Sequence, residues 1–136
     1  MPKLQFLTKK FAILSCDKGD ITGPIVEIPF MGYGKSEQTG TGMHTRQYCR
    51  AVAIEDLTEN IIIIATAEIG MVGYELKTAI INRINDNQNS TLTTGNLILT
   101  STHTHSAPGG YLTPFMFAFS VNGIHMEVFN RIDAVF

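Results

Sequence analysis

The sequence predicts an α/β fold in which a mixed or parallel sheet is flanked by helices. Three consecutive segments carry this prediction: an apolar, β-branched run at residues 61–64, a helical repeat at about 72–85, and a strand-like segment at 96–102. A strand, a helix and a strand in this order form a β-α-β unit, whose strands are parallel and whose crossover is right-handed. We therefore expect part of the sheet to be parallel.

The other strands are predicted from short apolar runs. Residues 11–16 lie between Lys10 and Asp17 and predict a first strand that opens into a long loop. Residues 48–55, rich in Ala, Val and Ile, predict a second strand, and residues 60–67 predict a third. Because the run within 60–67 does not alternate with polar residues, we expect that strand to be covered on both faces.

Two helices are expected. The first is amphipathic, because its apolar residues recur at helical spacing, at Val72, Leu76, Ala79, Ile80 and Ile84. The second begins near Met126, and no capping residue or glycine is present to end it before residue 136. The chain is therefore expected to stop inside this helix.

The composition of the chain limits the classes of protein to which it can belong. The 136 residues are 44% hydrophobic and 16% charged, which is ordinary for one globular domain. The net charge is -2 and the 10 basic residues are scattered, so no basic surface for nucleic acid is expected. The apolar run at 11–14 is too short for a secretory or membrane-spanning segment. Cys16 and Cys49 have neither a CxxC nor a metal-binding spacing, and we expect free thiols.

The segment 19–42 is the longest stretch without a regular element. It contains six glycines and two prolines, which regular helices and strands do not tolerate. No phosphate-binding glycine motif is present, so a nucleotide site is not predicted. We expect this loop to line the functional site, with Met31, Tyr33 and Met43 folded back over the edge of the sheet.

The strongest chemical signal follows the predicted strand at 96–102. His103 and His105 are two residues apart, and in extended backbone their side chains would project to the same side. Ligand sites in such sheets lie beyond the carboxyl ends of the strands, and residues 70–72 end the preceding strand at the same edge. Two imidazoles there could share a zinc ion. The alternative is a polar loop whose histidines cap a helix or bond backbone.

The C-terminal part of the chain is rich in phenylalanine. Two interpretations are open for these side chains: core packing, which we favour, or the wall of an apolar substrate groove. The residues concerned are Phe115, Phe117, Phe119, Phe129 and Phe136.

Several segments together resemble the neutral ceramidases, and in the same order along the chain. The matching stretches are DITGP at residues 20–24, MGY at 31–33, QTGTGMHTR at 38–46, IGM at 69–71, and THTHS at 102–106 followed by PGGY at 108–111. Each segment alone is weakly specific, but five in register make chance similarity improbable. The resemblance covers nearly the whole chain from Asp20 onward.

This resemblance implies a zinc-dependent amidase that cleaves the N-acyl bond of ceramide to give sphingosine and a fatty acid. It implies that residues 1–136 are the N-terminal portion of a single catalytic domain, an incomplete one. Residue by residue, His103 resembles the family's first zinc ligand, and His105 resembles the residue that binds the reacting carbonyl or oxyanion. His44 and Arg46 match motif positions without an assigned role. The family's other metal ligands and its active-site serine have no counterpart in these 136 residues.

The sequence departs from the family pattern at three points. Glu68 stands where the family has Asp, and Ala107 stands where it has Gly; each replacement adds bulk. The third departure concerns location, because the family is secreted or held at the cell surface and no export signal is visible here. The resemblance also implies a membrane surface as the source of the lipid substrate.

Two other classes of function are open. A non-catalytic homologue or binding module would bind metal weakly and show no turnover. A zinc hydrolase of the metallo-lactamase type would need a continuing HxHxDH run, but Ala107 and Pro108 follow the histidines instead.

Overall fold

The structure is a computed structural model that describes residues 11–33, 35, 37–88 and 90–135. Residues 1–10, on which the search for an export signal partly rests, lie outside the described part. Four strands and three helices follow one another as β1 (Phe11–Asp20), β2 (Tyr48–Asp56), β3 (Ile61–Ala67), α1 (Tyr74–Gln88), β4 (Leu97–Ser101), α2 (Phe115–Ser120) and α3 (Met126–Asp133).

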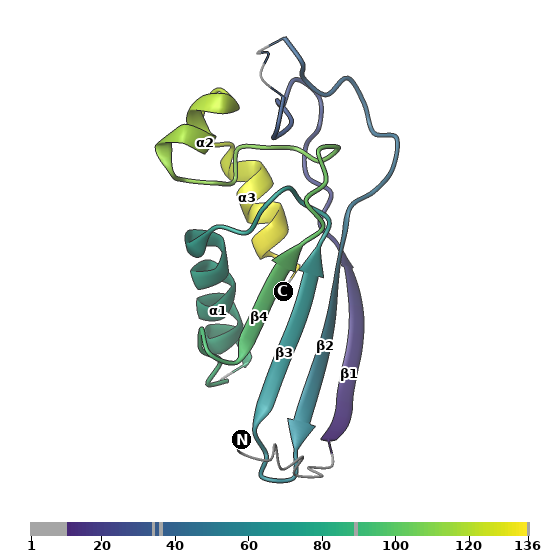
Figure 1. Cartoon of the computed structure of the whole chain (residues 1–136), viewed down its shortest axis with the longest axis vertical. Helices are drawn as coiled ribbons and strands as arrows, with labels where there is room; N and C mark the ends of the chain where they lie inside the picture. The colour runs from purple at the N-terminus through teal and green to yellow at the C-terminus, as the bar shows by residue number, and fades with distance from the viewer. Residues whose placement is uncertain (1–10, 34, 36, 89, 136) are drawn as a thin grey trace, which may run out of the picture.

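The strands form one mixed sheet in the order β1-β2-β3-β4 (Figure 1). β1 pairs with β2 and β2 with β3 in antiparallel fashion, whereas β3 and β4 are parallel and are joined through α1. The predicted β-α-β unit and the mixed α/β sheet are therefore confirmed. β1 extends four residues beyond the predicted end because Asp17–Asp20 continues the ladder with β2 despite its polar sequence.

The hydrophobic core lies between one face of the sheet and the helices. Ala65 and Ala67 of β3 and Leu97 of β4 point into this core and are almost fully buried. Leu76 and Ile80, one helical turn apart on α1, are completely buried against them.

The prediction that the third strand is covered on both faces is wrong. Ile62 is 43% exposed, Ile64 is 39% exposed and Ile98 on the neighbouring strand is 46% exposed. α1 and α3 contact each other and lie on the same side of the sheet (Figure 1). The reason is the connectivity: β1, β2 and β3 are joined without a crossover helix, so the single crossover covers only one face.

The last helix also differs from its prediction. α3 begins at Met126 as expected but ends at Asp133, before the end of the chain. The carboxylate of Asp133 is buried and accepts a hydrogen bond from Arg83 Nε at 2.6 Å, which ties the end of α3 to α1.

Cys16 is exposed, Cys49 is buried, and both are free thiols as predicted. None of the helices in the described residues has the length and apolar character needed to cross a membrane.

Candidate functional site

The loops that follow β3 and β4 meet at the carboxyl edge of the parallel strand pair, and the long loop between β1 and β2 lies at the same end of the molecule (Figure 1). His103 follows the last residue of β4 by two positions. His105 lies beside it, with the two Nε2 atoms 3.4 Å apart and the ring centroids 5.1 Å apart. The predicted pair of imidazoles is therefore present.

The backbone reason for this pairing differs from the one predicted. The strand ends at Ser101, and His103 has a φ angle of 58°, in the left-handed region, so the histidines do not lie on extended backbone. A turn of the loop brings the two rings together.

His103 is oriented by the segment that follows β3. Its Nδ1 lies 2.9 Å from the carbonyl oxygen of Gly70, which also accepts a hydrogen bond from Ser101 Oγ at 3.3 Å. A carbonyl oxygen can only accept, so the proton of the neutral imidazole is on Nδ1. The lone pair of Nε2 is thereby left free to bind an electrophile. Residues 70–72 were expected at this edge, and Gly70 is the one that contacts the histidine.

The spacing of the pair is compatible with a metal ion on one or both of the Nε2 atoms. With zinc–nitrogen bonds of about 2.0–2.1 Å, two tetrahedral nitrogen ligands lie about 3.3–3.4 Å apart. The separation of 3.4 Å between the Nε2 atoms equals that value and also permits a hydrogen bond between the rings. Within residues 11–33, 35, 37–88 and 90–135, no group of three or more His, Cys, Asp or Glu side chains is arranged to hold a metal. The pair is thus part of a metal site at most.

The glycine-rich loop reaches the histidines, as predicted, but only through its segment 31–33, since Met43 is 52% exposed and is not in the lining of the cavity beside them. Gly109 N donates to Pro29 O at 2.9 Å, which joins the long loop to the histidine loop. Gly32 then passes over His105: its φ angle is 94°, and a Cβ at this position would lie 2.3 Å from His105 Nδ1. Only glycine combines this backbone angle with so close an approach. The ring of Tyr33 meets that of His105 edge-on at 6.1 Å.

A cavity of about 430 Å³ opens beside the two histidines. Most of its lining is apolar, and it comes from the glycine-rich loop, the histidine loop and α2. The lining residues are Met31, Gly32, Tyr33, His103, His105, Met116, Phe117 and Ser120. The two imidazoles therefore border a largely apolar hollow.

The aromatic residues of α2 correct the preferred prediction of core packing. Phe115 and Phe119 are 75% and 73% exposed and stack on each other with centroids 5.8 Å apart. Phe117 and Phe129 are partly buried against the core, so core packing is confirmed for them. Phe136 lies outside the described residues. A six-residue helix has only one side to turn toward the core, so its other aromatic side chains extend the apolar surface beside the cavity.

His44 and Arg46 are not brought into the lining of this cavity. Arg46 donates to Asp20 at 2.8 Å, and His44 lies in a separate hollow with Gln47. Hydrogen bonds from Thr22 and the nearby Arg46 lower the pKa of Asp20 to about 2.

The buried Gln47 was missed by sequence analysis. Its Nε2 donates to the carbonyl oxygens of Thr45 and Ser106, so it ties the long loop to the histidine loop. Its place beside the matched HTR segment is the only signal that could have indicated it. A lone polar residue at the start of a strand carries no such information.

The two replacements within the family motifs are accommodated. Glu68 accepts a hydrogen bond from the backbone N of Tyr48 at 2.9 Å and pairs with Arg50, so the longer side chain finds partners on β2. Ala107 is buried, and its neighbour Pro108 forms an isolated bridge with Phe30.

Fold and site together define an α/β protein whose sheet edge presents two facing imidazoles, one of them with its Nδ1 held by the Gly70 carbonyl and its Nε2 lone pair free. Residues 13–135 match the family model described as neutral/alkaline non-lysosomal ceramidase, N-terminal. The chain belongs to this family.

Characterised relatives agree with this assignment. The neutral ceramidase of Drosophila pseudoobscura pseudoobscura is 41% identical over 112 residues, which cover 82% of this chain and 16% of the relative. The neutral ceramidase of Pseudomonas aeruginosa is 34% identical over 116 residues, covering 85% of this chain and 17% of the relative. The chain thus spans about a sixth of the length of these relatives.

Solved structures give the same result. The crystal structure of the Pseudomonas aeruginosa neutral ceramidase superposes with a TM-score of 0.85 at 32% identity, covering 92% of this chain and 20% of that one. A ceramidase complexed with C2 superposes with a TM-score of 0.86 at 30% identity, covering 93% and 20%. The mixed sheet with its helices therefore corresponds to part of the ceramidase fold.

Proposed function

We propose that residues 1–136 are the N-terminal portion of a neutral ceramidase catalytic domain, and that the protein hydrolyses the N-acyl amide bond of ceramide with the help of zinc. The products are sphingosine and a fatty acid. Membership of the ceramidase family supports the reaction class. The observation that carries the proposal is the orientation of His103, whose Nδ1 is held by Gly70 O while Nε2 faces its partner histidine.

His103 would be a protein ligand of the metal through Nε2. The hydrogen bond to Gly70 O keeps the proton on Nδ1, which is the tautomer that a metal-binding Nε2 requires. When bound, zinc supplies Lewis-acid polarisation of the amide carbonyl. No further ligand is assigned within the described residues, because no group of three metal-binding side chains occurs there.

His105 would hold the reacting carbonyl oxygen. Its Nε2 is 3.4 Å from that of His103, so an oxygen near the metal position would also lie within reach of His105. A protonated Nε2 donates a hydrogen bond to this oxygen, and the bond strengthens as negative charge develops on it. Removal of one such donor costs about 3–4 kcal/mol in transition-state stabilisation in other enzymes.

The apolar lining of the cavity supports a lipid substrate. Met31, Met116 and Phe117 line the same cavity as the two histidines, so a hydrocarbon chain can be buried while the amide reaches the imidazoles. A membrane surface would be the source of such a substrate, and an extracellular or cell-surface location follows from the family resemblance. Nucleic acid is not a proposed partner, given the net charge of -2.

The test uses three histidine variants in a form of the protein as long as its curated relatives. We expect His103→Ala to lose both zinc and amidase activity. We expect His105→Ala to keep its zinc but to lose roughly 100-fold or more in kcat, because the oxyanion donor is gone. His44→Ala is the matched control, since this exposed histidine is not in the lining of the cavity.

Zinc content is measured by atomic absorption, and turnover with a fluorescent short-chain ceramide. A full zinc complement in His103→Ala would contradict the assignment of that ligand. A different result would be an unmodified protein that binds zinc but has no amidase activity, together with loss of that zinc in His103→Ala. This result would favour a non-catalytic metal-binding homologue.

A further inference from the structure

The peptide group between Gly70 and Met71 is held from both sides. Its carbonyl oxygen lies 2.9 Å from His103 Nδ1, and its N–H donates to the hydroxyl oxygen of Tyr111 at 3.1 Å. Ser101 Oγ adds a second donor to the carbonyl at 3.3 Å. Rotation of this peptide group would therefore break contacts at both of its ends.

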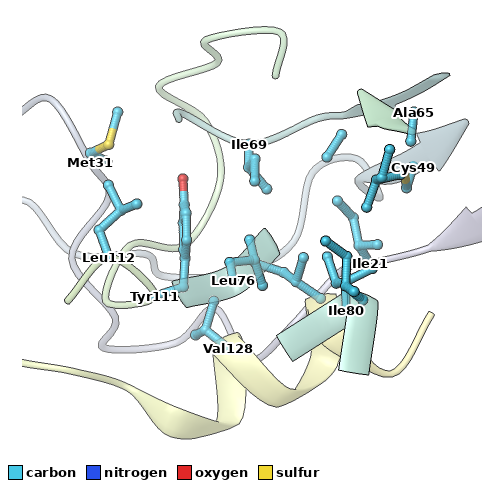
Figure 2. Close-up of a cluster of buried hydrophobic side chains, with 14 of the residues drawn as sticks. Ile21, Met31, Cys49, Ala65, Ile69, Leu76, Ile80, Tyr111, Leu112 and Val128 are labelled. Atoms are coloured by element: carbon cyan, nitrogen blue, oxygen red, sulfur yellow. The ribbon is translucent and has the colours of Figure 1, made fainter. Parts of the chain in front are cut away.

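Tyr111 is anchored far more firmly than the residue it supports. The side chain is 1% exposed, and its ring lies among buried apolar side chains, with Val128 near the end opposite to the hydroxyl (Figure 2). Burial raises the pKa of the Tyr111 hydroxyl, so the group stays protonated at neutral pH. His103, in contrast, is exposed. The buried core thus contacts the exposed edge of the site through one hydroxyl group.

The peptide group is closely packed against the glycine-rich loop and Tyr111. A Cβ on Gly70 would lie 2.2 Å from Met31 Cε and 3.4 Å from the Tyr111 hydroxyl oxygen. Met31 belongs to the glycine-rich loop and is itself buried. Three segments distant in sequence therefore enclose this peptide group.

The two ends of the histidine loop converge on the same peptide. His103 lies near the start of the loop and contacts the carbonyl, and Tyr111 lies near its end and contacts the N–H. Both hydrogen bonds polarise the peptide in the same sense, so each strengthens the other. A better polarised carbonyl holds the Nδ1–H tautomer of His103 more strongly.

We infer that Tyr111 is a positioning residue, which fixes the Gly70–Met71 peptide and through it holds His103 with the proton on Nδ1 and the Nε2 lone pair available. The inference rests on the proposed role of His103 as a metal ligand. Tyr111 itself contacts neither the cavity nor the face of Nε2. Supporting groups of this kind are worth about 10- to 100-fold in metal affinity.

The test compares Tyr111→Phe with Tyr74→Phe, a matched change at an exposed tyrosine on α1. The first readout is the tautomer of His103 in the metal-free 136-residue chain, taken from the nitrogen chemical shifts of its imidazole by NMR at a pH where the ring is neutral. We expect the unmodified protein and Tyr74→Phe to hold the proton on Nδ1. We expect Tyr111→Phe to give a mixture of both tautomers.

The second readout is zinc affinity, from titration of zinc into a form of the protein as long as its curated relatives. We expect Tyr111→Phe to lower it by about tenfold or more, and Tyr74→Phe to leave it unchanged. An Nε2–H tautomer in the unmodified protein would overturn the inference even if Tyr111→Phe failed to fold. So would a folded Tyr111→Phe protein with the original tautomer and affinity. Absence of zinc binding by this longer protein in its unmodified form, with the tautomers as expected, would instead count against the proposed function.

Discussion

The spacing of the two histidines predicts that they lie on an extended strand end. The observed site differs from this prediction because the φ angle of His103 is positive. The positive φ turns the chain immediately after β4, and the carbonyl of Gly70 then captures Nδ1. A non-glycine residue in the left-handed region costs of the order of 1 kcal/mol, which the surrounding contacts must offset. His103 is therefore held in place by its neighbours rather than by its own conformational preference.

Gly32 offers a test of the site at this scale. We expect Gly32→Ala to displace His105, because a Cβ would overlap its ring and because the φ angle of 94° is strained for alanine. The shift should appear in the NMR signals of the His105 imidazole. In a form as long as the relatives, kcat should fall by about tenfold or more, since small misplacements of a catalytic group are costly.

Gly42 is the matched control for this variant. It belongs to the same loop, but a Cβ there would meet nothing within 4 Å. Gly42→Ala should leave the His105 signals and the turnover unchanged. If Gly32→Ala and Gly42→Ala had the same His105 signals and the same turnover, the close approach of Gly32 would not be what positions His105.

Among the elements, the parallel pair β3 and β4 decides where the site forms. Both strands end at the same edge, so the Gly70 carbonyl and His103 meet although 33 residues separate them. α1 connects the two strands and covers their inner face with Leu76 and Ile80. Docking of this helix is therefore a condition for the register of the strands beneath the site.

We expect Leu76→Ala to lower the free energy of unfolding by about 2–5 kcal/mol, because a fully buried side chain would leave a cavity between α1 and the sheet. Urea denaturation followed by circular dichroism measures the change. Asn82→Ala, at an exposed position of the same helix, should change stability by less than about 0.5 kcal/mol. A Leu76→Ala protein as stable as the original would show that α1 is not docked as described.

At the scale of the whole molecule, the chain presents one edge of a site and a sheet with one exposed face. Ile62, Ile64 and Ile98 remain accessible on that face, and Phe115 and Phe119 remain accessible beside the cavity. The matched relatives are roughly five times as long as this chain, since 112 and 116 aligned residues cover only 16% and 17% of their length. Activity is therefore expected to depend on residues beyond the described pair of histidines.

We predict that the isolated 136-residue chain does not hydrolyse ceramide at a useful rate. A catalytic zinc usually takes three protein ligands, and the described residues bring together no such group. Purified protein would be assayed with added zinc and a fluorescent short-chain ceramide, with His103→Ala as the control. Zinc-dependent turnover well above this control would contradict the prediction and would point to a site completed by an oligomer.

Local pattern was sufficient for the strands, the two longer helices, the parallel β-α-β unit and the position of the histidines. Apolar residues that recur every 3.6 positions indicate a helix, and β-branched runs indicate a strand, because both patterns reflect the side-chain environment within one segment. The order of these elements along the chain then restricts how they can connect. The same logic placed residues 70–72 and 103 at one edge. The matched motifs then indicated the ceramidase family, which the comparisons confirm.

Only the tertiary structure decided which face of β3 is covered, that Phe115 and Phe119 are exposed, and how His103 is held. An apolar run does not reveal how many helices pack on a sheet, because that depends on connections elsewhere in the chain. Likewise, the tautomer of His103 depends on the carbonyl of Gly70, and this carbonyl is held by the hydroxyl of Tyr111. Such a backbone contact leaves no trace in the identity of the residues, because every residue has a carbonyl group.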